Sequence, residues 1–185
     1  MIIKPFHPFP ILETERLSLR EISDEDDHDL YEILSDPEVA LYDYFYPVDS
    51  IEKTHLFIRR YHSELMANDE ITWGIYLKTP SKLIGTCCLG NFDQDTLRAE
   101  VGYALLQSEW RKGYGTEAVG KIVDFGFEQM ALNRIEATIT PGNDGSVRLL
   151  EKVNFQKEGL VRQRDLIKGQ LVDGIIMGIL REDRG

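Results

Sequence analysis

The chain has 185 residues, 42% of them hydrophobic and 29% charged, and its formal net charge of −11 gives a pI near 4.8. This composition predicts one folded domain over residues 1–185 and excludes a disordered chain. The acidic balance argues against a nucleic-acid partner, which requires clustered Lys and Arg, and suits a cationic one. Apolar runs are short and prolines interrupt the N-terminus, so we expect a cytoplasmic protein with no membrane contact.

Strand and helix signals alternate through the first half of the chain. Ser23 is positioned to cap a helix with an acidic first turn, and Ser50 to cap a second helix that runs to Asn68. The strands expected in this half lie near residues 17–21, 73–77, 83–91 and 97–105. The last three form an antiparallel meander, because turn-like sequence separates them.

The second half begins with the clearest helix. Its apolar face carries Ala118, Val119, Ile122, Val123, Gly126 and Met130, and its polar face carries Glu117, Lys121, Asp124 and Glu128. A strand at 134–140 follows this helical crossover and should lie parallel to the strand before the helix. A short helix at 146–153 and two strands at 160–167 and 172–180 complete the predicted order.

Several residues invite a functional interpretation but have simpler explanations. Cys87 and Cys88 are neighbours in a strand and point to opposite faces, so reduced thiols are expected. His55 and His62 lie about two helical turns apart without further ligands, and no metal is predicted. Trp73 is expected in the core.

Residues 100–118 are the most informative segment, because a strand leads there through a basic glycine turn into a helix. Gly113 and Gly115 allow a sharp turn, and the helix start leaves N–H groups and a positive dipole end for an anion. Arg111 and Lys112 add positive charge. A Walker loop would need Lys-Ser or Lys-Thr after the last glycine, and a dinucleotide fingerprint would need three glycines, so neither fits. A diphosphate is the predicted ligand.

The segment Trp110-Arg111-Lys112-Gly113-Tyr114-Gly115 resembles the cofactor loop of the GNAT superfamily of acetyl-CoA-dependent N-acetyltransferases, written Gln/Arg-x-x-Gly-x-Gly/Ala. Trp110 stands at the first position, where many members have Gln or Arg. In this it resembles the subgroup that acetylates the N-termini of ribosomal proteins, in which a Trp is usual at that position. The phrases at 12–20 and 143–155 also resemble that subgroup, in the right order. The resemblance implies an α/β fold with a mixed, mostly antiparallel sheet of six or seven strands and about four helices.

The resemblance also implies acetyl-CoA as cosubstrate. The cofactor-binding residues expected from it are Leu105, Arg111, Lys112, Gly113, Tyr114, Gly115, Thr116 and Asn143. Leu105 belongs to this set through its backbone, because an N–H near Tyr103–Leu105 would stabilise the oxyanion if that strand is splayed or bulged.

Glu100 is the candidate general base, since it precedes the loop and shares a strand face with the small residues Gly102 and Ala104. A solvated surface carboxylate is the alternative. Many relatives use a Tyr as thiolate proton donor at the position of Leu150, so that donor is missing here. The resemblance suggests Ser146 near the sulfur, with Asn143 bonding the pantetheine arm, but both residues also suit helix capping.

Four aromatic residues in a loop form the candidate acceptor pocket, although they could equally pack together: Tyr42, Tyr44, Phe45 and Tyr46. The subgroup resemblance favours the N-terminal α-amine of a protein, such as a ribosomal protein, as acceptor. A small amine (a polyamine, amino acid or antibiotic) is the first alternative, and a non-catalytic acyl-CoA-binding module is the second. Monomer and homodimer both remain open.

Overall fold

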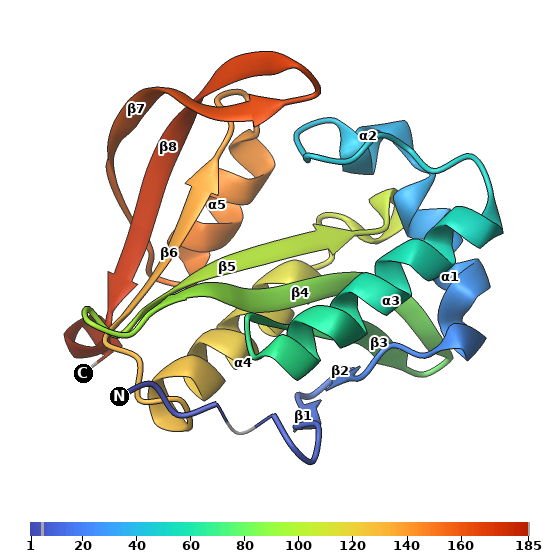
Figure 1. The fold of residues 1–185 in the computed structure, drawn as a ribbon, viewed down its shortest axis with the longest axis horizontal. Helices are drawn as coiled ribbons and strands as arrows, with labels where there is room; N and C mark the ends of the chain where they lie inside the picture. The colour runs from blue at the N-terminus through green and yellow to red at the C-terminus, as the bar shows by residue number, and fades with distance from the viewer. Residues whose placement is uncertain (5, 185) are drawn as a thin grey trace.

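One mixed sheet runs through the molecule in the strand order β1-β2-β3-β4-β5-β6-β8-β7, and helices cover both of its faces (Figure 1). The computed structural model describes residues 1–4 and 6–184. The strands are β1 (Leu12–Glu13), β2 (Leu17–Arg20), β3 (Glu70–Lys78), β4 (Ser81–Asp93), β5 (Arg98–Leu105), β6 (Arg134–Ile139), β7 (Gln156–Ile167) and β8 (Gln170–Leu180). The α-helices are α1 (Asp27–Leu34), α2 (Pro37–Ala40), α3 (Ile51–Ala67), α4 (Tyr114–Glu128) and α5 (Asp144–Lys152).

The predicted elements are all present, and the predicted counts were slightly low. The described residues form eight strands and five α-helices, where six or seven strands and about four helices were expected. The additional elements are β1, with two residues, and α2, with four, which are too short to give a periodic pattern. Ser50 and Asn68 do flank α3, but the Ser50 side chain makes no capping hydrogen bond.

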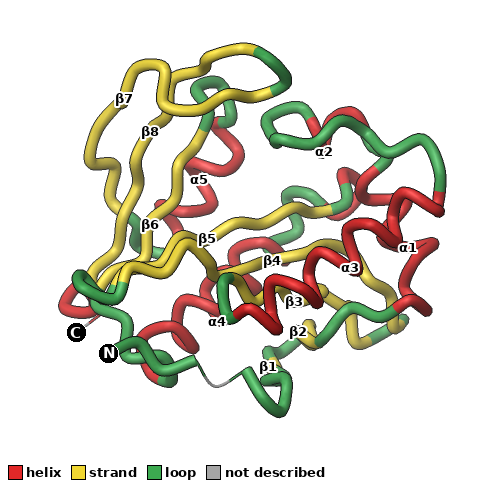
Figure 2. Tube along the Cα trace, in the orientation of Figure 1, coloured by secondary structure: helices red, strands yellow, loops and turns green. Residues whose placement is uncertain are grey.

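All neighbouring strands are antiparallel except β5 and β6, which are parallel as predicted from the helical crossover between them. The crossover helix α4 packs on one face of the sheet, while α1 and α3 cover the opposite face (Figures 1 and 2). The pair β5–α4 therefore brings the predicted loop, at residues 110–116, to the end of the central strand.

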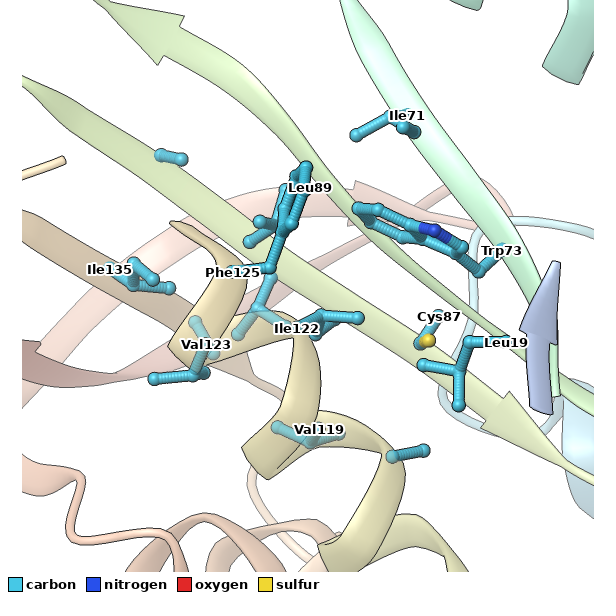
Figure 3. Close-up of a cluster of buried hydrophobic side chains, with 14 of the residues drawn as sticks. Leu19, Ile71, Trp73, Cys87, Leu89, Val119, Ile122, Val123, Phe125 and Ile135 are labelled. Carbon is cyan, nitrogen blue, oxygen red and sulfur yellow. The ribbon is translucent and has the colours of Figure 1, made fainter. Parts of the chain in front are cut away.

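The core between α4 and the sheet explains two of the simpler predictions. Trp73 is fully buried and its ring meets that of Phe125 edge-on at 5.4 Å (Figure 3). Cys87 lies in the same core and neither it nor Cys88 is in a disulfide, so the expected free thiols are confirmed. Within residues 1–4 and 6–184, no helix combines the length and the apolar character needed to cross a bilayer.

Candidate active site

A gap opens in the middle of the sheet because β5 and β6 separate. β5 and β6 pair with each other only over Arg98–Glu100 of β5. Beyond that point β5 continues to Leu105 and β6 to Ile139, and within the described residues the two strands do not pair with each other again. Figure 1 shows the two strands side by side at one end and diverging toward the other. The splay anticipated for the oxyanion site therefore exists, at the strand where it was expected.

The backbone of β5 presents unpaired groups to this gap. Leu106 donates its N–H to the Ile84 carbonyl on the β4 side. Because backbone groups alternate sides along a strand, the N–H groups of Tyr103 and Leu105 point toward the gap instead. Hydrogen-bond donors thus line the side of the strand that β6 has left.

The predicted loop is held against the end of β5 by Trp110. Its indole Nε1 donates to the Leu105 carbonyl at 2.7 Å, which gives the unusual first residue of the motif a structural role. Beyond it the chain turns through left-handed backbone at Arg111, with φ of 63°, and at Gly113, with φ of 87°. Gly113 is the N-cap of α4, as the helix-start prediction requires.

The loop leaves a row of free N–H groups. Among the residues that the structure describes, the N–H groups of residues 111–116 donate to no protein acceptor, and the first bond of the helix start is made by Glu117 to the Gly113 carbonyl. These amides coincide with the positive end of the α4 dipole. The arrangement is suited to bind a diphosphate.

The two predicted cations differ in their surroundings. Lys112 forms an ion pair with Glu109 at 3.0 Å, whereas Arg111 has no ion-pair partner in the described part of the chain. The two glycines differ as well. Gly113 is exposed, but Gly115 is buried, and a side chain there would meet Leu149 of α5 at 2.7 Å. Gly115 therefore permits close packing of α4 and α5, a role that the motif did not reveal.

Glu100 lies at the vertex where β5 and β6 diverge, and its side chain is 29% exposed. Its Oε1 accepts from the Asn91 amide at 2.6 Å and lies 3.4 Å from an Arg98 nitrogen. No described residue occupies Oε2. One oxygen of the candidate base is thus fixed, while the other is free for a proton.

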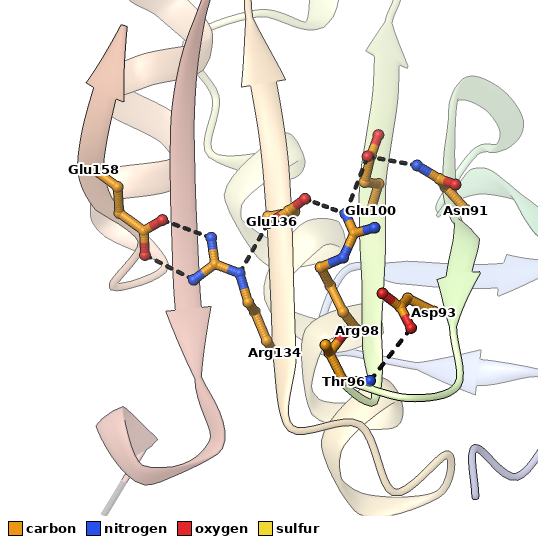
Figure 4. Close-up of polar contacts among 8 residues, drawn as sticks. All are labelled: Asn91, Asp93, Thr96, Arg98, Glu100, Arg134, Glu136 and Glu158. Carbon is orange, nitrogen blue, oxygen red and sulfur yellow. Dashed lines mark hydrogen bonds and ion pairs between the residues drawn. The ribbon is translucent and has the colours of Figure 1, made fainter. Parts of the chain in front are cut away.

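An ion-pair chain continues from this carboxylate across the sheet (Figure 4). Arg98 also pairs with Glu136, whose Oε2 is 2.8 Å from Arg134, and Arg134 forms a bidentate pair with Glu158 of β7 at 2.6 and 2.8 Å. The Arg98–Glu136 pair links the first paired residue of β5 to the last paired residue of β6. Arg98 could have been found from its i−2 spacing to Glu100, but the cross-strand partners depend on register.

The start of α5 faces the gap. The Asn143 side chain accepts from the Ser146 N–H at 3.2 Å, so Asn143 is a helix cap, and its amide nitrogen remains available for a ligand. The Ser146 carbonyl accepts from the Tyr103 hydroxyl at 3.3 Å, which links β5 to α5. Leu150 is fully buried. Partial burial raises the pKa of Tyr103 to about 12, so this hydroxyl, which the sequence did not single out, stays protonated at neutral pH.

The four aromatic residues do not form one cluster. Phe45 packs edge-on against Phe57 of α3 at 5.6 Å. The other three reach toward the gap and the β7–β8 hairpin. Tyr42 donates to the Gly142 carbonyl at 3.0 Å, and Lys168 of the hairpin lies 5.8 Å from the Tyr46 ring.

Tyr44 is the member whose pKa responds to the charge of the candidate base. Although 62% of the residue is exposed, partial burial of its hydroxyl, together with the carboxylates of Asp165 and Glu100, raises its pKa to about 12. The loop thus contributes one tyrosine within the electrostatic influence of two carboxylates, and one phenylalanine to the core. No group of three or more metal-binding side chains occurs in residues 1–4 and 6–184.

Comparison with known proteins gives a consistent result. The model of the acetyltransferase (GNAT) domain matches residues 16–156. The uncharacterized N-acetyltransferase p20 of Bacillus licheniformis is 38% identical over 93% of this chain and 97% of its own length. Two solved structures share the fold. RimJ from Mycobacterium smegmatis, in complex with CoA-disulfide, has a TM-score of 0.82 at 23% identity over 90% of this chain and 83% of its own. The ribosomal-protein-S5-alanine acetyltransferase from Vibrio fischeri has a TM-score of 0.79 at 23% identity, over 94% of this chain and 98% of its own.

Proposed function

The chain belongs to the GNAT acetyltransferase family, and on that premise we propose that it acetylates the N-terminal α-amine of a protein, with a ribosomal protein as the first candidate. Acetyl-CoA is the acetyl donor in this family, and the chain is an acetyl-CoA-dependent N-acetyltransferase. The proposal concerns the acceptor and the residues that act on it. The observation that carries it is the position of Glu100, at the vertex of the gap with one free carboxylate oxygen.

The residues present fit coenzyme A. Free N–H groups at 111–116 and the exposed Arg111 are suited to its diphosphate. The outward N–H groups of Tyr103 and Leu105 suit the amides of the pantetheine arm or a carbonyl oxygen that becomes negative. When bound, acetyl-CoA supplies an activated acyl carbon as a thioester.

Glu100 would accept a proton from the acceptor ammonium, directly or through one water. The amine nitrogen then attacks the thioester carbon, so that a C–N bond forms and the C–S bond breaks. An α-ammonium has a reference pKa near ~8, against ~10.4 for a lysine side chain, and is far easier to deprotonate near neutral pH. A single, partly exposed carboxylate such as Glu100 is therefore a more suitable base for an α-amine than for a lysine side chain.

The departing thiolate requires a proton. Ser146 lies at the start of α5, where its backbone N–H donates to Asn143 and its carbonyl accepts from the Tyr103 hydroxyl. We assign Ser146 as the candidate donor, in place of the tyrosine that Leu150 replaces. We assign Tyr44 to the acceptor side; its hydroxyl is protonated at neutral pH, since partial burial and the carboxylates of Asp165 and Glu100 raise its pKa to about 12.

Support for a protein acceptor comes from Trp110 and from the N-terminal phrase around Thr14 and Arg16, which resemble the ribosomal-protein subgroup. The acidic chain, with a net charge of −11, also suits a basic ribosomal protein.

The test is an acetyl-CoA consumption assay with three acceptor panels. The first contains peptides with free N-termini that begin with Ala, Ser or other residues. The second contains the same peptides with blocked N-termini and an internal lysine. The third contains small amines. Turnover with the first panel alone supports the proposal, turnover with the third alone makes the chain a small-amine acetyltransferase, and binding of acetyl-CoA without turnover on any panel leaves a non-catalytic module.

A further inference from the structure

A partly exposed ion-pair cluster, formed by Arg16 and Glu117, adjoins the predicted diphosphate loop. Glu117, in the first turn of α4, is on the helix face that the sequence pattern assigns to solvent, yet its side chain is only 18% exposed. Its Oε1 lies 2.6 Å from the Thr14 hydroxyl and accepts from the Arg16 N–H at 2.9 Å. Its Oε2 accepts from Arg16 Nε and Nη2, both at 2.7 Å.

Arg16 also contacts the loop itself. Its Nη1 donates to the Lys112 carbonyl at 3.0 Å, its guanidinium lies 4.5 Å from the centroid of the Tyr114 ring, and Nη2 lies 3.2 Å from the position that a Gly113 side chain would take. One side chain therefore spans the turn from Lys112 to Glu117.

This contact sets the direction of a loop amide. The peptide between Lys112 and Gly113 is planar and trans, so its carbonyl and its N–H point in opposite directions. Because Arg16 holds the carbonyl, the Gly113 N–H, one of the free amides of the loop, must face away from Arg16. Left-handed backbone is easy for Gly113 but costs energy at Arg111, and the neighbouring contact at Lys112 helps to offset that cost.

The negative charge of Glu117 is a second reason why the loop needs Arg16. Partial burial opposes ionisation, but hydrogen bonds from Thr14 and Arg16 outweigh it and lower the pKa of Glu117, so a carboxylate is fixed beside the anion site. An uncompensated carboxylate there would repel a diphosphate. Arg16 neutralises it.

We propose that Arg16 is a positioning residue for coenzyme A, which holds the diphosphate loop in its binding conformation through the Lys112 carbonyl and Glu117. It is not a catalytic residue. The inference rests on the assignment of residues 111–116 as the diphosphate site, and it adds a residue that lies 101 positions before Glu117 in the chain.

The test measures coenzyme A binding by titration calorimetry for the wild type, Arg16→Met and Arg16→Lys, with thermal unfolding as a second readout. Loss of charge-assisted hydrogen bonds should weaken binding by Arg16→Met about 10- to 100-fold. Arg16→Lys keeps the charge that neutralises Glu117 but loses the planar fork that reaches Glu117 and the Lys112 carbonyl together, so its affinity should lie between those of the wild type and Arg16→Met. Arg20→Met is the matched control, because Arg20 also stacks on a tyrosine ring, at 3.5 Å from Tyr76, but far from the loop.

Wild-type affinity in Arg16→Met would overturn the proposal. Wild-type affinity in Arg16→Lys would also overturn it, since charge alone would then suffice. Arg16→Lys retains the positive charge opposite Glu117, and so it keeps the test valid if Arg16→Met fails to fold. If the wild type itself does not bind coenzyme A, the diphosphate-site assignment fails, and this is distinguishable from failure of the role of Arg16.

Discussion

Replacement of Glu100 by Gln tests the proposed base with little disturbance of the fold. Gln keeps the size of the side chain and an oxygen that can accept from Asn91, at the 2.6 Å contact seen for Oε1. It loses the carboxylate and the 3.4 Å pairing with Arg98. That pair is partly exposed and long, so its loss should change the free energy of unfolding by less than about 1 kcal/mol.

The effect on turnover should be much larger. Removal of a general base typically costs on the order of 10²- to 10⁴-fold in rate, which is about 3–5 kcal/mol of activation free energy. We expect kcat for acetyl transfer to fall by this amount, while the Kd for coenzyme A stays within about twofold, because Glu100 lies apart from the diphosphate loop.

The assay is the initial rate of acetyl-CoA consumption with the best peptide acceptor, measured from pH 6 to 9, together with calorimetric binding of coenzyme A. Glu32→Gln is the matched control, since Glu32 is a surface carboxylate paired with Lys82 at 2.7 Å, at the other end of β4. A Glu100→Gln enzyme with wild-type kcat across this pH range would refute the assignment of Glu100 as base.

Three further predictions concern the loop and its support. Trp110→Phe removes the 2.7 Å bond to the Leu105 carbonyl and should weaken coenzyme A binding about fivefold by calorimetry, and unchanged affinity would mean that the bond does not fix the loop. The folded-state pKa of Glu117 is lowered, so its stabilisation is present above its unfolded pKa of about 4.3 and is lost as the pH falls through the folded value. The unfolding free energies of wild type and Glu117→Gln should therefore differ by roughly 1–2 kcal/mol at pH 7 and converge as the pH falls through the lowered pKa of Glu117. A difference that stays constant in acid would contradict this. Gly115→Val should destabilise the fold by about 1–3 kcal/mol through its clash with Leu149, as measured by denaturant unfolding. The double variant with Leu149→Ala should relieve part of this clash. Additive losses of stability in the double variant would argue against the contact.

Local sequence patterns determined much of the architecture. Alternation located the strands, capping signals placed α3 between Ser50 and Asn68, and the crossover logic made β6 parallel to β5. A sharp turn was predicted at Gly113 and Gly115, and the structure has it at Gly113, the left-handed N-cap, whereas Gly115 lies within α4. These features depend on residues within a few positions of one another, where backbone sterics and side-chain period act directly.

The same local patterns predicted only some of the residues and backbone groups that form the site. The strand that bears Glu100 and the row of loop amides were expected, and the structure brings them to one gap. The aromatic loop was predicted to form one pocket or one packed cluster, but its members diverge: Phe45 packs on α3, whereas Tyr42 and Tyr46 contact Gly142 and Lys168. A short loop has no fixed period, so the direction of each side chain is set by what packs around it.

Tertiary structure alone decided the contacts that support the site. The Arg16–Glu117 cluster joins residues 101 positions apart, and the chain from Glu100 to Glu158 crosses strands whose register the sequence does not state. The role of Gly115 against Leu149 also becomes visible only when two helices meet. Sequence thus determined which local conformations the chain adopts. The pairing of distant charges and the separation of β5 from β6 depend instead on how those elements pack. The reason is that the partner of a side chain across a sheet or between helices is fixed by register and burial and not by sequence spacing.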